Sequence, residues 1–187
     1  SARSTNLSSP AGGSRNSDLP IVSADGRYVV FASTAANLVT NAGPISELSP
    51  RRFQVFVRDR QTGVTALVSA NVSGFPGDGD SFPSAISTNG QFILFESAAG
   101  DLVNGDINGQ EDVFLRDVAN RTTELISVNT NGFPGNGNSH NAVITPDARF
   151  IAFSSGASDL VASDTNGIPD VFVRDRFATS TTLASVG

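Results

Sequence analysis

The sequence of 187 residues contains no cysteine, methionine, tryptophan or lysine, and it has a single histidine and a single tyrosine. The absence of cysteine and lysine excludes a thiol nucleophile and Schiff-base chemistry. The histidine, His140, follows Ser139, but a general base must reach its nucleophile in space, and adjacency in sequence does not provide that reach. We therefore expect no enzymatic activity and assign no catalytic residue.

Positive charge is also scarce, because twelve basic residues stand against eighteen acidic ones, which gives a net charge of -6 and a pI near 4.6. A nucleic-acid partner needs a basic face, so this class of partner is excluded. No stretch approaches the roughly 20 apolar residues of a membrane span. The lack of lysine, together with abundant Asn, Ser, Thr and Gly, indicates an extracellular, cell-surface or periplasmic protein.

What the sequence does have is an internal repeat. Residues of the same type recur at a spacing of 58: Phe56, Phe114 and Phe172; Arg58, Arg116 and Arg174; Ser69, Ser127 and Ser185. The first copy carries a loop insertion, since fifteen residues separate Val39 from Val55 and only nine separate Val103 from Val113. The chain is therefore three copies of one unit.

Each unit has four strand signals, which in the second copy are residues 84–88, 91–97, 112–118 and 122–128. Tight turns are expected at 24–26, 88–90 and 146–148, and helical periodicity is absent. Strands such as "YVVF" and "FILF" are apolar at every position, which indicates that both of their faces are covered. We predict one all-β domain, 1–187, of three four-stranded antiparallel propeller blades at about 18–70, 82–128 and 140–187. A sandwich is the alternative, but it would not need a repeat of 58 residues.

The stretch "PIVSADGRYVVFAS" (20–33), followed later by "VFVRDR", resembles the TolB-type propeller repeat, a relative of the WD repeat. The resemblance covers the chain three times, although the turn reads Thr-Asn-Gly-Gln in the second copy and Pro-Asp-Ala-Arg in the third. It implies a propeller, often six-bladed, in a secreted or periplasmic protein, and mostly a role in binding other proteins. This implication is an analogy of fold.

Three blades are fewer than the four to eight of typical closed propellers. The chain is therefore half of a six-bladed ring, an open array, or a fragment of a longer chain. The first and third blades should each expose an apolar face, and such faces pair head to tail into a closed ring or a filament. We predict a structural protein that self-associates in this way. The alternative is a module that binds another surface protein or a glycan.

An Arg-Asp pair ends the third strand of every copy: Arg58–Asp59, Arg116–Asp117 and Arg174–Asp175. Repetition in every blade favours a structural role over a single binding site. We expect these arginines to pair with a carboxylate of a neighbouring blade or with backbone carbonyls.

The motif D-x-N-G-x-x-D precedes the third strand in two copies: Asp106, Asn108 and Asp112, and Asp164, Asn166 and Asp170. Calcium prefers several oxygen ligands, and the oxygens of a Gly-containing turn can converge on one ion. We predict a calcium ion at each motif, completed by backbone carbonyls and by Asp101 or Asp159. The first copy lacks the motif and would lack the ion. The alternative is an Asx-turn that caps backbone N–H groups.

Overall fold

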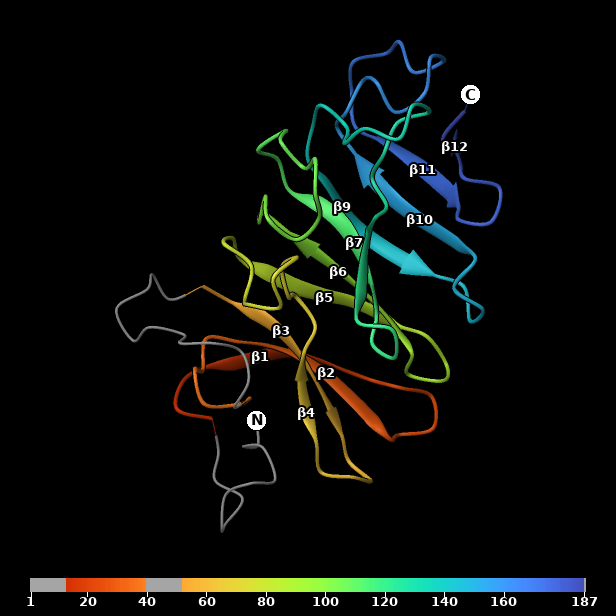
Figure 1. Cartoon of the computed structure of the whole chain (residues 1–187). Coiled ribbons are helices and arrows are strands. Elements are labelled where there is room, and N and C mark those ends of the chain that lie inside the picture. Colours follow the sequence, from red (N-terminus) through yellow and green to blue (C-terminus); the bar gives the residue numbers. More distant parts are fainter. Residues whose placement is uncertain (1–12, 40–51, 187) are drawn as a thin grey trace.

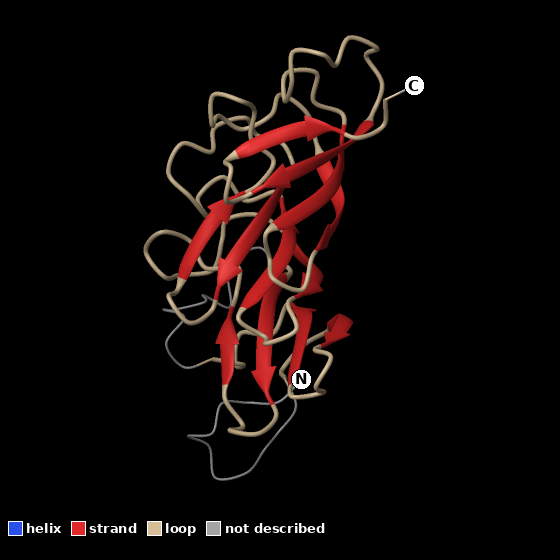
Figure 2. Cartoon of the chain, turned by 90° about the vertical axis from the view of Figure 1, so that its right-hand side faces the viewer, coloured by secondary structure: helices blue, strands red, loops and turns tan. Residues whose placement is uncertain are grey.

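The computed structural model describes residues 13–39 and 52–186, and this part of the chain consists of strands, turns and loops without a helix (Figure 2). Its twelve strands form three separate four-stranded antiparallel sheets, and in each sheet the strands are neighbours in the order of the sequence. Figure 1 shows the sheets one beside the next, as successive blades. The all-β fold and the three four-stranded repeats are thus confirmed.

The strand bounds repeat closely between the blades. Blade 1 contains β1 (Ser17–Val22), β2 (Tyr28–Ser33), β3 (Gln54–Asp59) and β4 (Thr65–Leu67). Blade 2 contains β5 (Ser81–Ile86), β6 (Phe92–Ser97), β7 (Asp112–Asp117) and β8 (Thr122–Leu125). Blade 3 contains β9 (Ser139–Ile144), β10 (Phe150–Ser155), β11 (Asp170–Asp175) and β12 (Ser180–Leu183).

The first strand of each blade begins earlier than the sequence pattern indicates, and β5 starts at Ser81 rather than at residue 84. Its pairing with β6 is interrupted between Pro83 and Ala85, where the register shifts. Proline cannot donate to the ladder and sits at such irregular positions. Because the register shifts here, the alternation of apolar and polar residues does not extend to the beginning of the strand.

The predicted turns lie where the first and second strands meet. Gly26 and Gly90 have φ of 70° and 73°, and Ala148 takes the same position in blade 3 with φ of 57°. Positive φ is cheap for glycine and strained for alanine. The turn geometry is therefore kept in all three blades although the residue type is not.

Each blade has two apolar faces, which we call front and back. The back face carries a stacked phenylalanine pair with ring centroids 5.6–6.0 Å apart: Phe31–Phe56, Phe95–Phe114 and Phe153–Phe172. The front face carries aliphatic residues at the alternate positions, such as Val30 and Val57 in blade 1. Two buried clusters join front faces to the back faces of the next blades, one between blades 1 and 2 and one between blades 2 and 3.

The up-and-down order of strands creates two ends. Turns between the first and second strands, and between the third and fourth, lie at one end, the short-turn end. The loops between the second and third strands, and the linkers between blades, lie at the other, the long-loop end. Contacts between β1 and β5 and between β5 and β9 place the first strands of the blades side by side. In the described part of the chain, no helix is long and apolar enough to cross a membrane.

Candidate functional site

The contact between the front face of one blade and the back face of the next, which we call a seam, contains polar as well as apolar groups. In the seam between blades 2 and 3, Ser139 N donates to the carbonyl of Glu111 (2.7 Å) and Glu111 N donates to Asn138 Oδ1 (2.9 Å). The seam between blades 1 and 2 has the equivalent pair of bonds, from Ser81 N to Phe53 O and from Phe53 N to Asp80 Oδ1. Successive blades are therefore joined by backbone hydrogen bonds as well as by apolar packing.

The motif of blade 2 lies at this seam. Asn108 Nδ2 donates to Asp112 Oδ2 (2.6 Å) and to the carbonyl of Gly135 (2.9 Å), which belongs to the linker that leads to blade 3. Asp112 Oδ1 accepts from the Ser127 hydroxyl at 2.5 Å. The Asp112 side chain is fully buried, and burial raises its pKa to about 6. The motif thus connects the last strand of one blade to the linker of the next.

In blade 1 a single residue makes the same connection. Gln54, which aligns with Asp112, accepts from the Ser69 hydroxyl through Oε1 (2.6 Å). Its Nε2 donates to the carbonyls of Gly77 (3.0 Å) and Gly79 (3.2 Å) in the linker to blade 2. The sequence analysis treated this copy as having lost the motif. The structure shows that a neutral glutamine replaces the Asn-Asp pair in the same hydrogen-bonded position.

In blade 3 the motif has the same internal geometry. Asn166 Nδ2 donates to Asp170 Oδ2 (2.7 Å), and Asp170 Oδ1 accepts from the Ser185 hydroxyl at 2.5 Å. Among the described residues, the only hydrogen bond of Asn166 Nδ2 is the one to Asp170. Within residues 13–39 and 52–186, no linker carbonyl accepts the second amide hydrogen of Asn166, as Gly135 does for Asn108 in blade 2.

The calcium prediction rests on the oxygens of these motifs. Asn108 Oδ1 and Asn166 Oδ1 accept from the backbone N–H two residues later, so both asparagines form Asx-turns. Burial raises the pKa of Asp106, and Asp164 Oδ1 is buried without a partner in the described part of the chain, which is the kind of oxygen that a cation would complete. No group of three or more His, Asp or Glu side chains suited to a metal occurs in residues 13–39 and 52–186. Calcium binding stays a prediction.

The two residues expected to complete the calcium shells serve the linkers instead. Asp101 accepts from Asn71 Nδ2 (2.7 Å) and from Asp78 N (3.0 Å). Asp159 accepts from Asn136 N at 2.9 Å. Each carboxylate therefore holds the linker that enters its own blade.

The arginines of the Arg-Asp pairs have a partner that the sequence analysis missed. Their Nη1 atoms donate to a threonine hydroxyl on the fourth strand of the same blade: Arg58 to Thr65, Arg116 to Thr123 and Arg174 to Thr181. Arg174 also donates to the backbone carbonyl of Thr179. The role is structural, as expected, but the partners lie within the blade.

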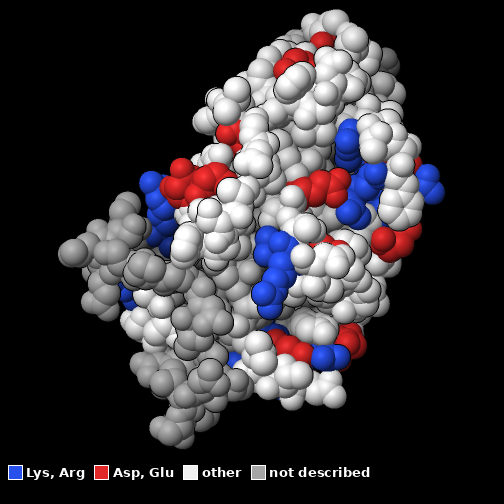
Figure 3. Space-filling view, viewed as in Figure 1, with Lys and Arg blue, Asp and Glu red and all other residues white. Residues whose placement is uncertain are grey.

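The aspartates of these pairs organise the short-turn end. Asp59 and Asp175 each accept a bidentate arginine, Arg27 and Arg149, with closest distances of 2.7 and 2.8 Å. The arginine side chain lowers the pKa of each aspartate. Figure 3 shows blue and red side chains next to each other on the right and lower side of the molecule, whereas the upper part carries few charges.

The ion pair between blades involves a different arginine. Arg176 Nη2 lies 2.8 Å from Glu124 Oε2 across the seam between blades 2 and 3, and its Nη1 donates to the carbonyl of Ala148. Arg60 takes the same position in blade 1 and donates to the carbonyl of Gly26 (2.7 Å). The neighbouring-blade carboxylate expected for Arg174 thus binds Arg176.

Ser139 and His140 do not form a nucleophile and base pair. The Ser139 hydroxyl is buried and bonds the Ser155 hydroxyl (2.9 Å), as Ser81 bonds Ser97 in blade 2. His140 is the second residue of β9, one of the adjacent first strands. Ser139 is therefore a structural residue of the strand pair.

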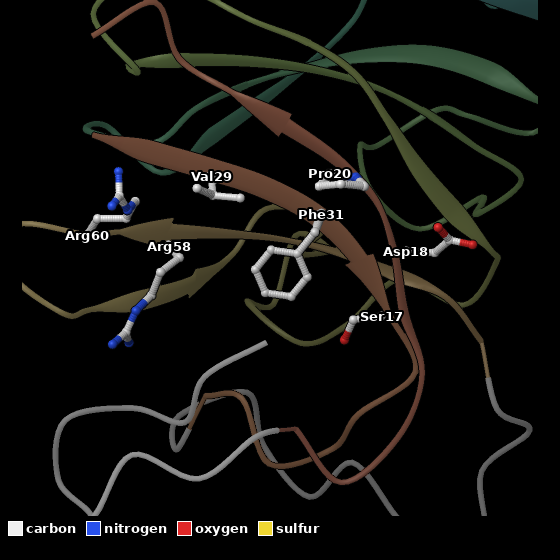
Figure 4. Close-up of a pocket in the computed structure, with 7 residues that line it drawn as sticks. All are labelled: Ser17, Asp18, Pro20, Val29, Phe31, Arg58 and Arg60. Carbon is white, nitrogen blue, oxygen red and sulfur yellow. The ribbon is translucent and has the colours of Figure 1, made fainter. Parts of the chain in front are cut away.

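The outermost faces of the stack differ from the seams. On the front of blade 3, Val171 is 40% exposed, whereas the equivalent Val55 and Val113 are fully buried. On the back of blade 1 lies a pocket of about 510 Å³, lined by Ser17, Asp18, Pro20, Val29, Phe31, Arg58 and Arg60 (Figure 4). Val29 is partly exposed there, whereas the equivalent Ile93 is fully buried against the preceding blade; Phe31 is buried, as Phe95 is. The pocket lies on the face that packs against the preceding blade in the other two blades.

Comparison with known proteins identifies the fold. No protein-family model matches the sequence, and no curated protein matches it. Among solved structures, TolB from Acinetobacter baumannii is similar with a TM-score of 0.53 and 18% identity over 97% of this chain and 36% of that chain. The β-propeller domain of the Trilobed protease from Pyrococcus furiosus is similar with a TM-score of 0.54 and 11% identity over 90% and 41%.

The tricorn protease is similar with a TM-score of 0.54 and 16% identity over 91% of this chain and 17% of that one. This chain spans less than half the length of each of these proteins, and at such identities the likeness concerns the fold. The similar structures include both TolB and parts of proteases, so the fold alone does not decide between an enzyme and a binding protein. The three blades of this chain have the fold of TolB-type β-propeller repeats.

Proposed function

We propose that this chain is a non-enzymatic propeller protein of the cell exterior, cell surface or periplasm that self-associates through its two open blade faces. The front of blade 3 in one copy packs on the back of blade 1 in another. The exposure of Val171, at a position buried in both other blades, carries this proposal. Apolar faces left open in this way favour association, because burying them removes apolar surface from water.

The two open faces are complementary because the repeat makes them so. The front of blade 3 presents Val171 and Val173 where blade 2 presents Val113 and Leu115. The back of blade 1 has the stacked pair of Phe31 and Phe56, as the backs of blades 2 and 3 have theirs. Both rings are buried within the chain, so the partly exposed Val29 supplies the apolar contact there. A docked copy would therefore repeat a contact that the chain already makes twice.

The polar groups at the new seam are also compatible. In the seam between blades 2 and 3, Glu96 Oε1 accepts from Ala142 N at 3.1 Å. Ser154 aligns with Glu96, and Pro20 aligns with Ala142. The docked seam would therefore lack this carboxylate and this N–H together, so neither would be buried without its partner.

Head-to-tail contacts close into a ring if the rotation permits and continue as a filament if it does not. Two copies provide six blades, a number within the four to eight of typical closed propellers. A two-copy ring buries both open faces, whereas each filament retains one at either end. We therefore propose the ring as the assembled form.

Light scattering on the purified protein tests this proposal. At micromolar concentration we expect twice the 19.3 kDa mass of the chain, and Val171→Asp should return the protein to a folded monomer. Val72→Asp, at an exposed linker position, is the matched control and should leave association intact. A wild-type monomer at tens of micromolar would refute the proposal.

A second function is favoured by the arginines of the open pocket. Arg60 aligns with Arg176, which binds a carboxylate of the neighbouring blade. The pocket could accept an acidic segment of another protein, with Val29 supplying the apolar contact. In this case an oligoglutamate peptide should bind wild type and lose affinity in Arg60→Ala, while light scattering shows a monomer.

A further inference from the structure

The two seams contain the same series of side-chain hydrogen bonds, although different residues form it in each. It begins at a serine hydroxyl two residues after the fourth strand, passes to an amide or carboxylate oxygen, and ends with an amide N–H donated to a linker carbonyl. Gln54 performs both later steps in the first seam. Asp112 and Asn108 divide these steps between them in the second.

We propose that D-x-N-G-x-x-D is an amide latch between successive blades, and that Asn166 is the latch for a docking copy of this chain. Its target is a backbone carbonyl of that copy, in the place that the carbonyls of Gly77 and Gly135 take within the chain. The part that concerns Asn166 rests on the proposed self-association. The part that concerns Asn108 does not, because its partner lies in the same chain.

The glycine at the receiving end has a steric reason. A Cβ on Gly77 would lie 2.8 Å from Leu102 Cδ2, and a Cβ on Gly135 would lie 2.9 Å from Leu160 Cδ2. Both distances are shorter than carbon atoms tolerate. Because glycine has no side chain, the linker lies directly on the core of its own blade. The carbonyl of the glycine then faces the amide of the preceding blade.

The aspartate has a positioning role in this latch. It accepts one amide hydrogen of the asparagine and thereby directs the other toward the linker, while the Asx-turn occupies the asparagine oxygen. The bond between a charged acceptor and an amide is also stronger than one between neutral groups. Gln54 needs no such partner because its own carbonyl oxygen is held by Ser69.

The internal latch is tested by thermal melting at a protein concentration where wild type is fully in one state. Asn108→Ala should lower the melting temperature by about 6–12 °C, because it removes three side-chain hydrogen bonds at about 1 kcal/mol each in a chain of this length. Asn104→Ala, at an exposed position of the same loop, is the control and should change it little. Asn108→Ala with Asp112→Gln should recover most of the loss, because the glutamine copies Gln54.

The same pair of changes in blade 3 tests the docking latch by light scattering. Asn166→Ala should weaken self-association roughly fivefold, and adding Asp170→Gln should restore it. If wild type associates and Asn166→Ala associates equally well, the docking latch is wrong while the proposed function stands. If wild type is a monomer, the proposed function fails and the Asn108 variants still decide the internal latch.

Calcium provides the remaining arm of the test. A latch requires no metal, so millimolar calcium should leave the melting temperature of wild type and of both glutamine variants unchanged. A rise with calcium in wild type that disappears in Asn108→Ala would support the calcium prediction and overturn the latch. An Asn108→Ala protein that melts like Asn104→Ala would overturn it equally.

Discussion

Gln54→Ala should be among the most destabilising single changes in the first seam. Gln54 is 6% exposed and makes three side-chain hydrogen bonds, with the Ser69 hydroxyl and with the carbonyls of Gly77 and Gly79. Alanine removes all three and leaves the partners in an environment that excludes much of the water. At about 1 kcal/mol for each lost bond, the free energy of unfolding should fall by about 3 kcal/mol.

A loss of about 3 kcal/mol corresponds to a melting temperature lower by about 6–12 °C in a domain of this size. Circular dichroism melting, repeated as urea denaturation, measures both quantities. Gln61→Ala is the matched control, since Gln61 is exposed in the β3–β4 turn, and its change should stay within about 0.5 kcal/mol. A Gln54→Ala protein that melts within 2 °C of the control, on the order of experimental error, would refute the reasoning that this amide holds the seam.

Three other outcomes follow from the same structure. A Cβ on Gly79 would overlap the backbone of Ala98, so Gly79→Ala should lower the melting temperature by several degrees. Gly156→Ala is the control in a parallel melting scan and should leave it unchanged, because the space around Gly156 is open. Burial raises the pKa of Asp112 to about 6, so the folded protein holds more protons there than the unfolded chain between pH 3.8 and about 6, and stability falls as pH rises through this window. In urea titrations, the free energy of unfolding of Asp112→Asn relative to that of wild type should therefore rise over that window, and a constant difference would contradict it. Arg116→Ala should lower the melting temperature by about 3 °C, because the half-buried hydroxyl of Thr123 loses its hydrogen-bond donor. An unchanged melting temperature would show that the arginine has no structural role.

The repeat predicts the fold because the side chains that fill the core recur at a fixed spacing in the sequence. Phe56, Phe114 and Phe172 recur at one spacing and all lie on back faces, so the count of blades and the pairing of their strands follow from the sequence. The beginning of β5 does not follow, because Pro83 interrupts the alternation at a register shift. A pattern of alternating residues fails wherever the ladder itself is irregular.

The latch could not be predicted for a different reason. Its receiving group is a backbone carbonyl, at Gly77 or Gly135, and a carbonyl leaves no residue signature in the sequence. Gln54 also hides the equivalence of the first copy, because one amide replaces two residues of a motif. An alignment of the three copies around Gln54, Asp112 and Asp170, with attention to donors and acceptors rather than identity, would have indicated a common role.

For the arginines of the Arg-Asp pairs, the sequence indicates a role but not the hydrogen-bond partners. The sequence favours a structural role for Arg58, Arg116 and Arg174, since every blade has one. Their partners are threonines of the adjacent strand, found through cross-strand register rather than through charge. Opposite charge is a weak guide here because Asp59 and Asp175 are already held by arginines at the neighbouring turns.

The most direct measurement of the proposed self-association is site-specific cross-linking across the new seam. The chain has no cysteine, so Val171→Cys and Val29→Cys each introduce a single thiol, one on the front of blade 3 and one on the back of blade 1. Mixed and treated with a short bis-maleimide, the two variants should give a covalent dimer that contains one of each, and Val72→Cys with Val29→Cys should not. If the first mixture yields no more dimer than the second, the open faces do not meet, and the account of a ring completed by a second copy is contradicted.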